Sequence, residues 1–576
     1  MRVRVITRPL WYPLATGMAA LALAATARAQ TATTPAGWVA AVHRAQRDFE
    51  ALRRNHLPWA AGGGGSGHCD AQIGRFCYWH GDRYEPPPVE SEVVFRARMG
   101  LLALLDSASA AIPSDDWIAG QRVRYWLEMG QPDSALASLW ACAATGWWCD
   151  ALRGLAEHEA GRDTMSLQAF DAALAEMPPQ DRCHWLDLSP VLQGDLADRY
   201  RHTGCAERQR VDARIWWLAD PFYSRPGNDR EAEHYSRLAM VRIAAASVWP
   251  EAQFWGNDLA ELMVRYGWAR WFARERPSRM SDPSYPIVGH DPQPSLAFLP
   301  SARAFDSPVD AEPADWDLTA YAAASRYAPP YVRVVEPVRA LFSRFARGDS
   351  QIVVAAWDAR GDSLLGRAAS VASVVATTDE RQRWMARVAG AEPWGGVAVT
   401  APSRGLVVGV ELLADSAYAA GRVRQGLAAL SAPGEAALSD ILFFRPDTAV
   451  PTRLAEVVPR AVTGVGAGDA PSIGMYWELR DPALDTARAM DVSLSIERTH
   501  AGWWDRTRRM FHLGGSDAPI ALSWHDLARP VAGIVGRAVV VDLSPLDDGV
   551  YRVRLRVRVA GRPPFETARP LTLNRR

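Results

Sequence analysis

The chain has 576 residues and 48% of them are hydrophobic, which is enough for roughly three to five domains with ordinary cores. Its formal net charge of −1 at pH 7 excludes a global electrostatic field that would recruit nucleic acid or anionic lipid. All 64 basic residues are arginine, so enzymes that use a lysine nucleophile or Schiff base are excluded as well.

The first 29 residues have the layout of a secretory signal peptide. Arg2 and Arg4 give a positive start, an apolar run follows at 14–25, and an A-x-A cleavage site lies at 27–29. The apolar run is too short to span a bilayer, and no later segment has the roughly 18 uninterrupted apolar residues that spanning requires. We therefore expect an exported chain that begins near Gln30, lies in the periplasm or at the cell surface, and has no transmembrane segment after cleavage.

The six cysteines are an even number, which in an exported chain predicts disulfides. Sequence neighbours would close three short loops, and these are the pairings that we predict. The pairs are Cys69 with Cys77, Cys142 with Cys149, and Cys183 with Cys205.

One of these pairs lies in a stretch that also suits zinc. His68, Cys69, Cys77 and His80 are all residue types that bind this ion, so the segment is a candidate metal site. A disulfide with two bystander histidines is the alternative, which oxidising surroundings favour. His158 lacks the second histidine of a zinc-protease helix and is expected at the surface. We expect no cofactor.

The N-terminal part of the chain is predicted to be helical. Residues 30–92 begin with a helix over 37–57 and continue through a Gly-rich hinge into a stiff proline run at 86–88. Residues 93–205 are predicted to form helices in pairs, because apolar residues recur at three- and four-residue steps.

Residues 150–178 resemble the tetratricopeptide repeat, although Arg153 stands where the family has leucine. The resemblance implies a small stack of helix pairs with a concave binding face, and an ordinary helical bundle is the alternative. The residues at the family's preferred positions are Gly154, Gly161, Phe170, Ala173 and Pro178.

Residues 206–280 resemble the bacterial GWxTD domain. The family's features occur in order: a tryptophan followed by Asp220-Pro221, an Asn/Glu-rich helix start, an altered signature at 254–258, and an Arg-Tyr-Gly end at 265–267. The resemblance implies secretion and a mixed α/β architecture, and it implies no chemistry.

Local physics predicts two helix starts in this module. Asn228 can cap one helix through its side-chain oxygen, and Asp258 with Glu261 forms a pair like a capping box. The family resemblance instead favours a strand over 259–266, so both interpretations of that segment remain open.

From about residue 334 the hydrophobic period changes to two, which predicts strands. We expect one β-sandwich at 334–450 and a second at 472–576. A linker at 451–471 would join them, and an extended linker at 281–333 would precede them.

The segment 548–557 alternates most clearly, with valine and leucine on one face and arginine on the other. Its turn, Gly-x-Tyr and alternating valines resemble the last strands of an immunoglobulin-like sandwich, which implies a fold and not a function. The expected fold class is therefore multidomain α + β: helical repeats, a mixed α/β module and two immunoglobulin-like β-sandwiches.

Ionisable residues are densest within 220–258. Asp229, His234 and Asp258 are candidates for acid–base catalysis or metal binding. Capping and salt-bridge roles are the alternative, and we expect no catalysis.

A second candidate site combines tryptophan with arginine between two strands of the last sandwich. Trp503, Trp504, Arg506 and Arg509 are residue types that dominate binding sites, so they are candidates for contact with a partner or a glycan. A loop that packs on its own sandwich is the alternative.

Together these patterns predict an exported, non-catalytic scaffold that mediates protein–protein interaction in the bacterial cell envelope. Its protein partner would bind the face of the helical repeats, and no nucleic acid is expected. The alternatives are an envelope hydrolase that uses 220–258 and a glycan-binding module that uses Trp503 and Trp504.

Overall fold

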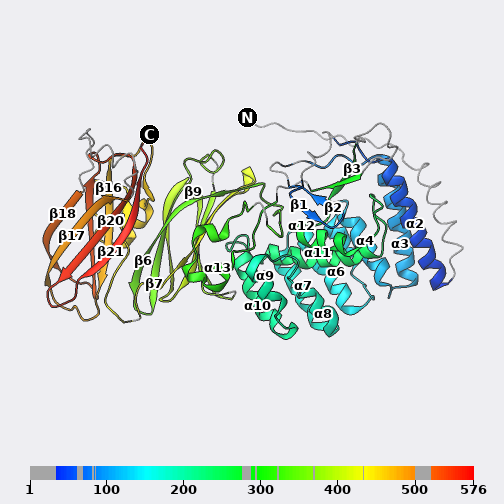
Figure 1. Ribbon diagram of the computed structural model, residues 1–576, viewed down its shortest axis with the longest axis horizontal. Coiled ribbons are helices and arrows are strands. Elements are labelled where there is room, and N and C mark those ends of the chain that lie inside the picture. Colours follow the sequence, from blue (N-terminus) through cyan, green and yellow to red (C-terminus); the bar gives the residue numbers. More distant parts are fainter. Residues whose placement is uncertain are drawn as a thin grey trace, which may run out of the picture. The chain divides into compact units, whose positions relative to one another are not determined.

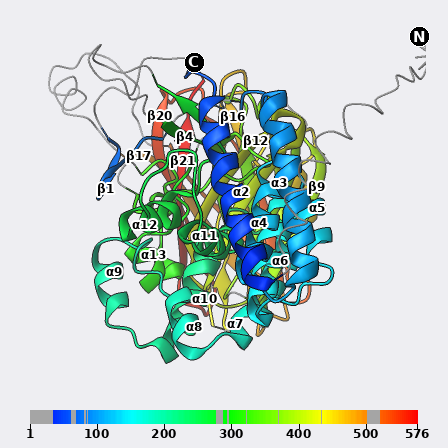
Figure 2. The same cartoon turned by 90° about the vertical axis from the view of Figure 1, so that its right-hand side faces the viewer.

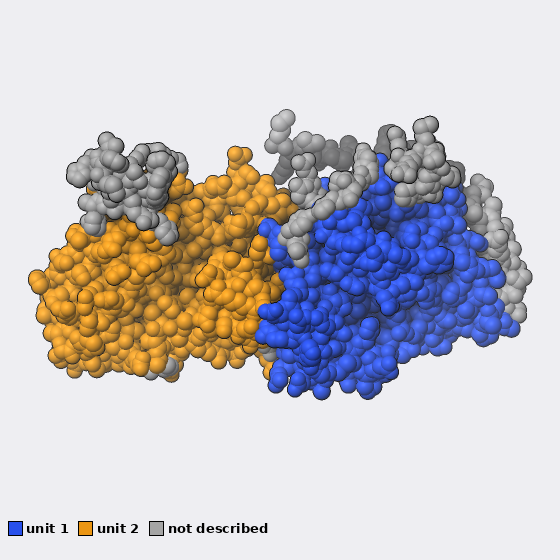
Figure 3. Space-filling view, in the orientation of Figure 1, with its two compact units in different colours: residues 1–212, 226–298, 319–330 blue, residues 213–225, 299–318, 331–576 orange. Residues whose placement is uncertain are grey.

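The chain divides into two compact units (Figure 3). Unit 1 comprises residues 1–212, 226–298 and 319–330, and unit 2 comprises residues 213–225, 299–318 and 331–576. Mixed α and β structure is present, with 34% helix and 31% strand. The computed structural model describes residues 34–60, 69–80, 84, 86–275, 287–291, 295–320, 323–367, 370–379, 381–432, 434–499 and 520–575.

The expected signal peptide at 1–29 lies outside the described residues. Within the described ranges, no helix combines the length and the apolar character that crossing a bilayer would need.

Unit 1 is mainly helical, and the first two helices in its described part, α2 (Pro35–Asn55) and α3 (Glu92–Ala111), lie side by side (Figure 2). The side chains of Thr34 and Ser91 cap their N-termini, which satisfies backbone N–H groups that have no partner inside a helix. The helices that follow in chain order are α4 (Asp116–Leu127), α5 (Pro132–Ser138), α6 (Gly146–Glu159), α7 (Asp163–Glu176), α8 (Pro179–Trp185), α9 (Gly194–Arg201), α10 (Cys205–Ala219), α11 (Asp229–Ala245) and α12 (Asn257–Tyr266). Residues 205–212 of α10 belong to unit 1 and residues 213–219 to unit 2.

Helices α6 and α7 form a closely packed pair. Gly161 between them has φ +70°, a conformation that glycine adopts without strain. Gly154 faces the ring of Phe170 and Ala173 is fully buried. The close approach of small residues expected at 150–178 is present, while membership of the tetratricopeptide family stays a prediction.

The two predicted helix starts in the GWxTD-like module have different outcomes. The Asn228 side chain accepts a hydrogen bond from Glu231 N at 3.2 Å, so α11 begins as predicted. The segment that ends the module is the helix α12 and not a strand. The predicted capping box of Asp258 with Glu261 is wrong, because the N-cap is Gly256 and the Asp258 carboxylate is bound by another segment.

Unit 1 also contains two short hairpins and three disulfides. The hairpins pair β1 (Ala71–Ile73) with β2 (Phe76–Tyr78), and β3 (Trp271–Arg274) with β4 (Ile287–His290). The disulfides match the three predicted pairings, with Cα–Cα distances of 5.4, 6.0 and 5.5 Å that are ordinary for this bond. Disulfides fit a chain that folds in an oxidising compartment.

In unit 2, the first pair of sheets packs around a shared apolar core (Figure 1). One sheet has the order β10-β7-β6 and the other the order β5-β12-β11-β8-β9. Most neighbours are antiparallel, whereas β5 runs parallel to β12. The strands are β5 (Val334–Pro337), β6 (Arg339–Arg347), β7 (Ser350–Asp358), β8 (Ser370–Thr377), β9 (Arg383–Ala391), β10 (Trp394–Pro402), β11 (Leu406–Ala414) and β12 (Ala419–Leu427).

The second pair of sheets encloses a separate core. One sheet contains β13, β16, β14 and β19, and the other has the order β15-β21-β20-β17-β18. The predicted alternation at 548–557 is confirmed, because buried and exposed residues alternate along β20. The strands are β13 (Ala437–Leu438), β14 (Leu442–Phe444), β15 (Gly464–Val465), β16 (Ser472–Arg480), β17 (Arg488–Arg498), β18 (Ile520–Ala528), β19 (Ile534–Asp542), β20 (Gly549–Val559) and β21 (Phe565–Leu573).

The predicted boundary between the sandwiches, at 450 with a linker at 451–471, differs from the observed one. Strand β14 pairs with β16 and strand β15 pairs with β21, so residues on both sides of 450 belong to the second sandwich. The run Leu442–Phe444 is buried on both faces, since Phe443 joins the core of the second sandwich while Leu442 and Phe444 pack on β6 and β7. A strand buried on both faces has no alternating pattern to reveal it.

Part of the predicted linker at 281–333 is ordered in unit 2. It forms α13 (Ala302–Asp306), η1 (Pro308–Asp310) and η2 (Pro313–Trp316), and both 3₁₀ turns contact β12. Trp316 is buried there and donates a hydrogen bond to the Leu218 carbonyl at 3.3 Å.

Candidate functional site

The candidate acid–base residues of α11 are buried. Asp229 and His234 are 6% and 0% exposed, and Asp229 accepts a hydrogen bond from Tyr327 Oη at 3.2 Å. Burial, together with the charges of Arg230 and Arg237, lowers the pKa of His234 well below its usual value, so its imidazole is neutral. A polymeric substrate cannot reach either side chain in this conformation.

Asp258, the third candidate, forms an ion pair with a distant segment of the chain. It binds Arg75 at the tip of the hairpin that the Cys69–Cys77 disulfide closes. Arg75 Nε donates to Asp258 Oδ2 at 2.7 Å and Nη2 donates to Oδ1 at 2.9 Å. These hydrogen bonds hold the pKa of Asp258 well below its usual range. At the same tip, a β-carbon on Gly74 would come within 2.5 Å of Asp258, so the hairpin is clamped against the start of α12.

The candidate zinc residues form no metal site among those that the structure describes. Cys69 and Cys77 are joined in a disulfide, which removes both thiolates as ligands. His80 Nδ1 lies 2.9 Å from Asp70 Oδ2, and His68 lies outside the described residues. No group of three or more His, Cys, Asp or Glu residues suited to a metal ion occurs in the described ranges.

His158 is buried, in contrast to the predicted surface position. Its Nδ1 lies 2.7 Å from Asp163 Oδ1 and its Nε2 lies 2.9 Å from Glu233 Oε2, while Arg237 Nε donates to Glu233 Oε1 at 2.6 Å. Burial alone would lower the pKa of His158, but the hydrogen bonds to Asp163 and Glu233 outweigh it and raise the pKa to about 10. The cluster therefore ties α6, α7 and α11 together by paired charges.

Sequence reasoning missed this cluster because Glu233 lies 75 residues from His158 in the chain. No local spacing signals such a contact. The cluster is enclosed and its charges are paired, which is typical of a structural role rather than of catalysis.

A surface hollow on the helical pairs is the best candidate for binding a partner. It measures about 300 Å³ and is lined by Leu136, Leu139, Trp140 and Arg153. Trp140 is 94% exposed, an unusual state for the largest apolar side chain. Arg153 Nη1 donates to Asp150 Oδ1 at 2.7 Å, so its guanidinium is oriented at the edge of the hollow.

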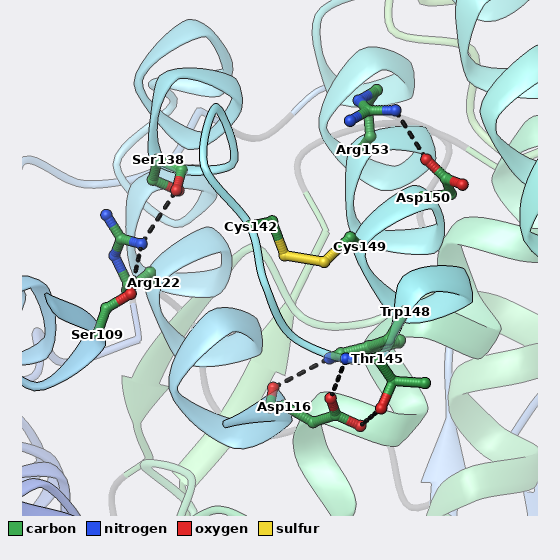
Figure 4. The surroundings of a disulfide bond; sticks show 10 residues. All are labelled: Ser109, Asp116, Arg122, Ser138, Cys142, Thr145, Trp148, Cys149, Asp150 and Arg153. Carbon is green, nitrogen blue, oxygen red and sulfur yellow. Dashed lines mark hydrogen bonds and ion pairs between the residues drawn. A yellow bond between two sulfur atoms is a disulfide. The ribbon is translucent and has the colours of Figure 1, made fainter. Parts of the chain in front are cut away.

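The loop that carries Trp140 is fixed from both sides. The Cys142–Cys149 disulfide joins the loop to the first turn of α6 (Figure 4). At the preceding end of the loop, Arg122 Nη1 donates to the Ser138 carbonyl at 3.0 Å and to Ser109 Oγ at 3.1 Å.

The following end of the loop is held by Asp116. Thr145 N donates to Asp116 Oδ1 at 2.9 Å, and Trp148 Nε1 donates to the Asp116 carbonyl at 3.0 Å (Figure 4). Trp148 is 1% exposed, in contrast to Trp140 on the same loop-and-helix segment. One tryptophan therefore anchors the segment while the other is presented to solvent.

The sequence pointed to the helical repeat region but not to Trp140. Trp147 and Trp148 lie inside the loop that the same disulfide closes and are buried. A position next to a short closed loop therefore does not distinguish Trp140, whose exposure depends on the helices around it.

The predicted partner-binding cluster of Trp503, Trp504, Arg506 and Arg509 lies outside the described residues. It falls between β17 and β18 in the chain.

No family model matches the chain, and no curated protein matches it. Among solved structures, the crystal structure of red sea bream transglutaminase is similar to part of the chain, with a TM-score of 0.15 and 12% identity. That match covers 42% of this chain and 31% of the transglutaminase chain. A similarity this weak supports no inference about fold or function.

Proposed function

We propose that this chain is an exported, non-catalytic scaffold that binds a protein partner in the bacterial cell envelope, and that the partner docks at the Trp140 hollow. The observation that carries the proposal is the pairing of a 94% exposed Trp140 with a loop held by the Cys142–Cys149 disulfide.

Covering the Trp140 hollow would remove apolar surface from water, which favours binding. An aromatic side chain of this size buries roughly 150–250 Å² when it is enclosed, and tryptophan and arginine are the residues that most often dominate protein interfaces. Because the loop is already ordered, a partner pays little conformational entropy to engage Trp140. The hollow beside it, at about 300 Å³, has room for a large apolar side chain of the partner.

Other features agree with a scaffold. Three disulfides suit an envelope compartment, and the resemblances to tetratricopeptide repeats and to the GWxTD domain both imply architecture rather than chemistry. The burial of Asp229 and His234 weighs against the alternative of an envelope hydrolase. In this proposal the sandwiches of unit 2 serve as further folded modules of the scaffold.

A pull-down tests the proposal. The mature chain, tagged at its C-terminus, is incubated with its own envelope fraction and compared with the Trp140→Ala variant. Phe254→Ala is the matched control, because Phe254 is 85% exposed in the same unit. Mass spectrometry is expected to identify a stoichiometric partner with the wild type and with Phe254→Ala but not with Trp140→Ala. The purified partner should then bind the wild type and Phe254→Ala with equal affinity and Trp140→Ala more weakly.

The variant separates binding from folding. Trp140→Ala is expected to change the free energy of unfolding by no more than about 0.5 kcal/mol, as is usual for an exposed side chain. A chain without any stoichiometric partner, or one that keeps its partner after Trp140→Ala, would contradict the proposal.

A further inference from the structure

The outer face of the second sandwich carries a ladder of arginines. Along β20 the buried side chains are Val553, Leu555 and Val557, and those that alternate with them are exposed. These exposed residues are Arg552, Arg554, Arg556 and Arg558. Side chains two positions apart on a strand are about 6.8 Å apart, so the four guanidinium groups follow a line of roughly 20 Å.

The neighbouring strands leave the middle of this ladder open. Strand β20 lies between β17 and β21 in the sheet (Figure 1). Arg554 is flanked in register by Ser495 on β17 and Ala568 on β21. On the far side of Ser495, the residue in register on the next strand, β18, is Ala521. The guanidinium of Arg554 therefore rises above short side chains.

The neighbouring residues of Arg556 on the adjacent strands are polar and include an acid. Arg556 lies between Ser493 and Glu566, and its Nε is 3.1 Å from Glu566 Oε1. That pair is exposed at 46% and 50%, so a ligand anion can replace Glu566 at little cost.

The ends of the ladder are flanked by acids as well. Arg552 lies beside Glu497, and Arg558 lies beside Asp491. The acids lie at the ends and on one edge, which leaves Arg554 as the centre of positive charge on this face.

We propose that this face, centred on Arg554, binds an extended acidic polysaccharide through its carboxylate groups. Arginine suits this chemistry because its planar guanidinium binds a carboxylate with two parallel hydrogen bonds. The hydroxyls of Ser493 and Ser495 add donors and acceptors for sugar hydroxyls, and the short side chains around Arg554 let a sugar ring approach the sheet.

An acidic peptide fits this face less well. Peptides that bind sheets add a strand at an exposed edge, whereas β20 already pairs with strands on both sides. A polysaccharide needs only side-chain contacts, which the exposed arginines and the serines of this face can supply. This inference is independent of the Trp140 hollow, which lies in unit 1.

Polygalacturonate, a polymer with one carboxylate per sugar, is the probe for the test. Its binding to the full mature chain is measured by calorimetry at a series of salt concentrations, and compared with the double variant Arg554→Ser/Arg556→Ser. The control is Arg488→Ser, an exposed arginine on β17 that lies outside the ladder. We expect the affinity to fall with salt and to drop at least about tenfold in the double variant, equivalent to 1.4 kcal/mol, with no change in the control.

Three results would overturn the inference: no binding at low salt, equal binding by the double variant, or equal binding of polyglutamate, which would indicate a general attraction to polyanions. If the double variant fails to fold, Arg552→Ser/Arg558→Ser repeats the test on the same ladder. Loss of polysaccharide binding with partner binding intact would separate this site from the Trp140 hollow.

Discussion

Gly154 lies against the ring of Phe170, so close that a β-carbon added to the glycine would come within 2.8 Å of the ring. Phe170 is 1% exposed and has little freedom to move away. The contact sets the separation of α6 and α7. Arg153, which lines the Trp140 hollow, lies on α6.

This contact predicts an unusual response to a helix-favouring substitution. In a helix interior alanine normally stabilises by roughly 1 kcal/mol relative to glycine. We expect Gly154→Ala to destabilise instead, by about 1–3 kcal/mol, because overpacking forces the helices apart. Chemical denaturation measures the change. Gly100 in α3 is the control, since a β-carbon there meets nothing within 4 Å, and Gly100→Ala should stabilise.

The His158 cluster predicts a loss of stability in mild alkali. The pKa of His158 is about 10 in the folded chain and about 6.5 when unfolded. The stabilisation by His158 is therefore complete below pH 6.5 and is lost as the pH rises toward 10. No lysine is present and all six cysteines are in disulfides, so neither residue type titrates between pH 7 and 9, and comparison with a His158 variant isolates the part that belongs to His158.

The free energy of unfolding of the wild type and of His158→Gln, measured from pH 6 to pH 9, tests whether His158 is charged in the folded chain. The variant should be less stable by about 3–5 kcal/mol at pH 6, where it leaves Glu233 and Asp163 without the cation, and the difference should shrink as the pH rises. An exposed histidine, His202, supplies the control variant. A difference that is independent of pH would show that His158 is not charged in the folded chain.

The clamp between Arg75 and Asp258 predicts local loosening rather than loss of an activity. Asp258→Asn removes the carboxylate that accepts from Arg75 at 2.7 and 2.9 Å. Hydrogen exchange should increase in the hairpin at 71–78 and at the start of α12, while the rest of unit 1 keeps its protection. Glu261→Gln, which affects only the exposed pair with Arg265, should leave the hairpin unchanged.

The disulfide beside the hollow predicts a different local effect. Cys142→Ser/Cys149→Ser is expected to lower the free energy of unfolding by about 2–3 kcal/mol, as the chain-entropy model gives for so short a loop. Proteolysis at 139–145 should accelerate, because the loop loses its link to α6. The matched variant Cys69→Ser/Cys77→Ser should leave that cleavage rate unchanged, and equal rates in both variants would show that the disulfide does not order the Trp140 loop.

Local signals in the sequence predicted the features that depend on near neighbours. The three disulfides follow from short spacings, the Asn228 cap from one turn of helix, and β20 from strict alternation. The coarse class of mixed helices and sheets was also predictable, from the change of hydrophobic period along the chain.

Features that depend on distant contacts were not predictable in the same way. His158 is buried because Glu233 reaches it across 75 residues, and Phe443 is hidden because two packed layers cover its strand. Trp140 lacked a signal of its own, since whether a tryptophan is exposed depends on the helices around it. The candidate acid–base residues do not form one site, because Asp258 binds Arg75 while Asp229 accepts a hydrogen bond from Tyr327.

Site-specific photo-crosslinking from position 141 tests the central claim most directly. A benzophenone amino acid replaces Ala141, the exposed neighbour of Trp140, so that Trp140 itself stays in place. The full chain is produced in its own host and irradiated in intact cells, and position 254 carries the same group as a control. We expect one discrete crosslinked protein from position 141 and none from position 254. No crosslink from position 141, or the same products from both positions, would contradict the assignment of the Trp140 hollow as the partner-binding site.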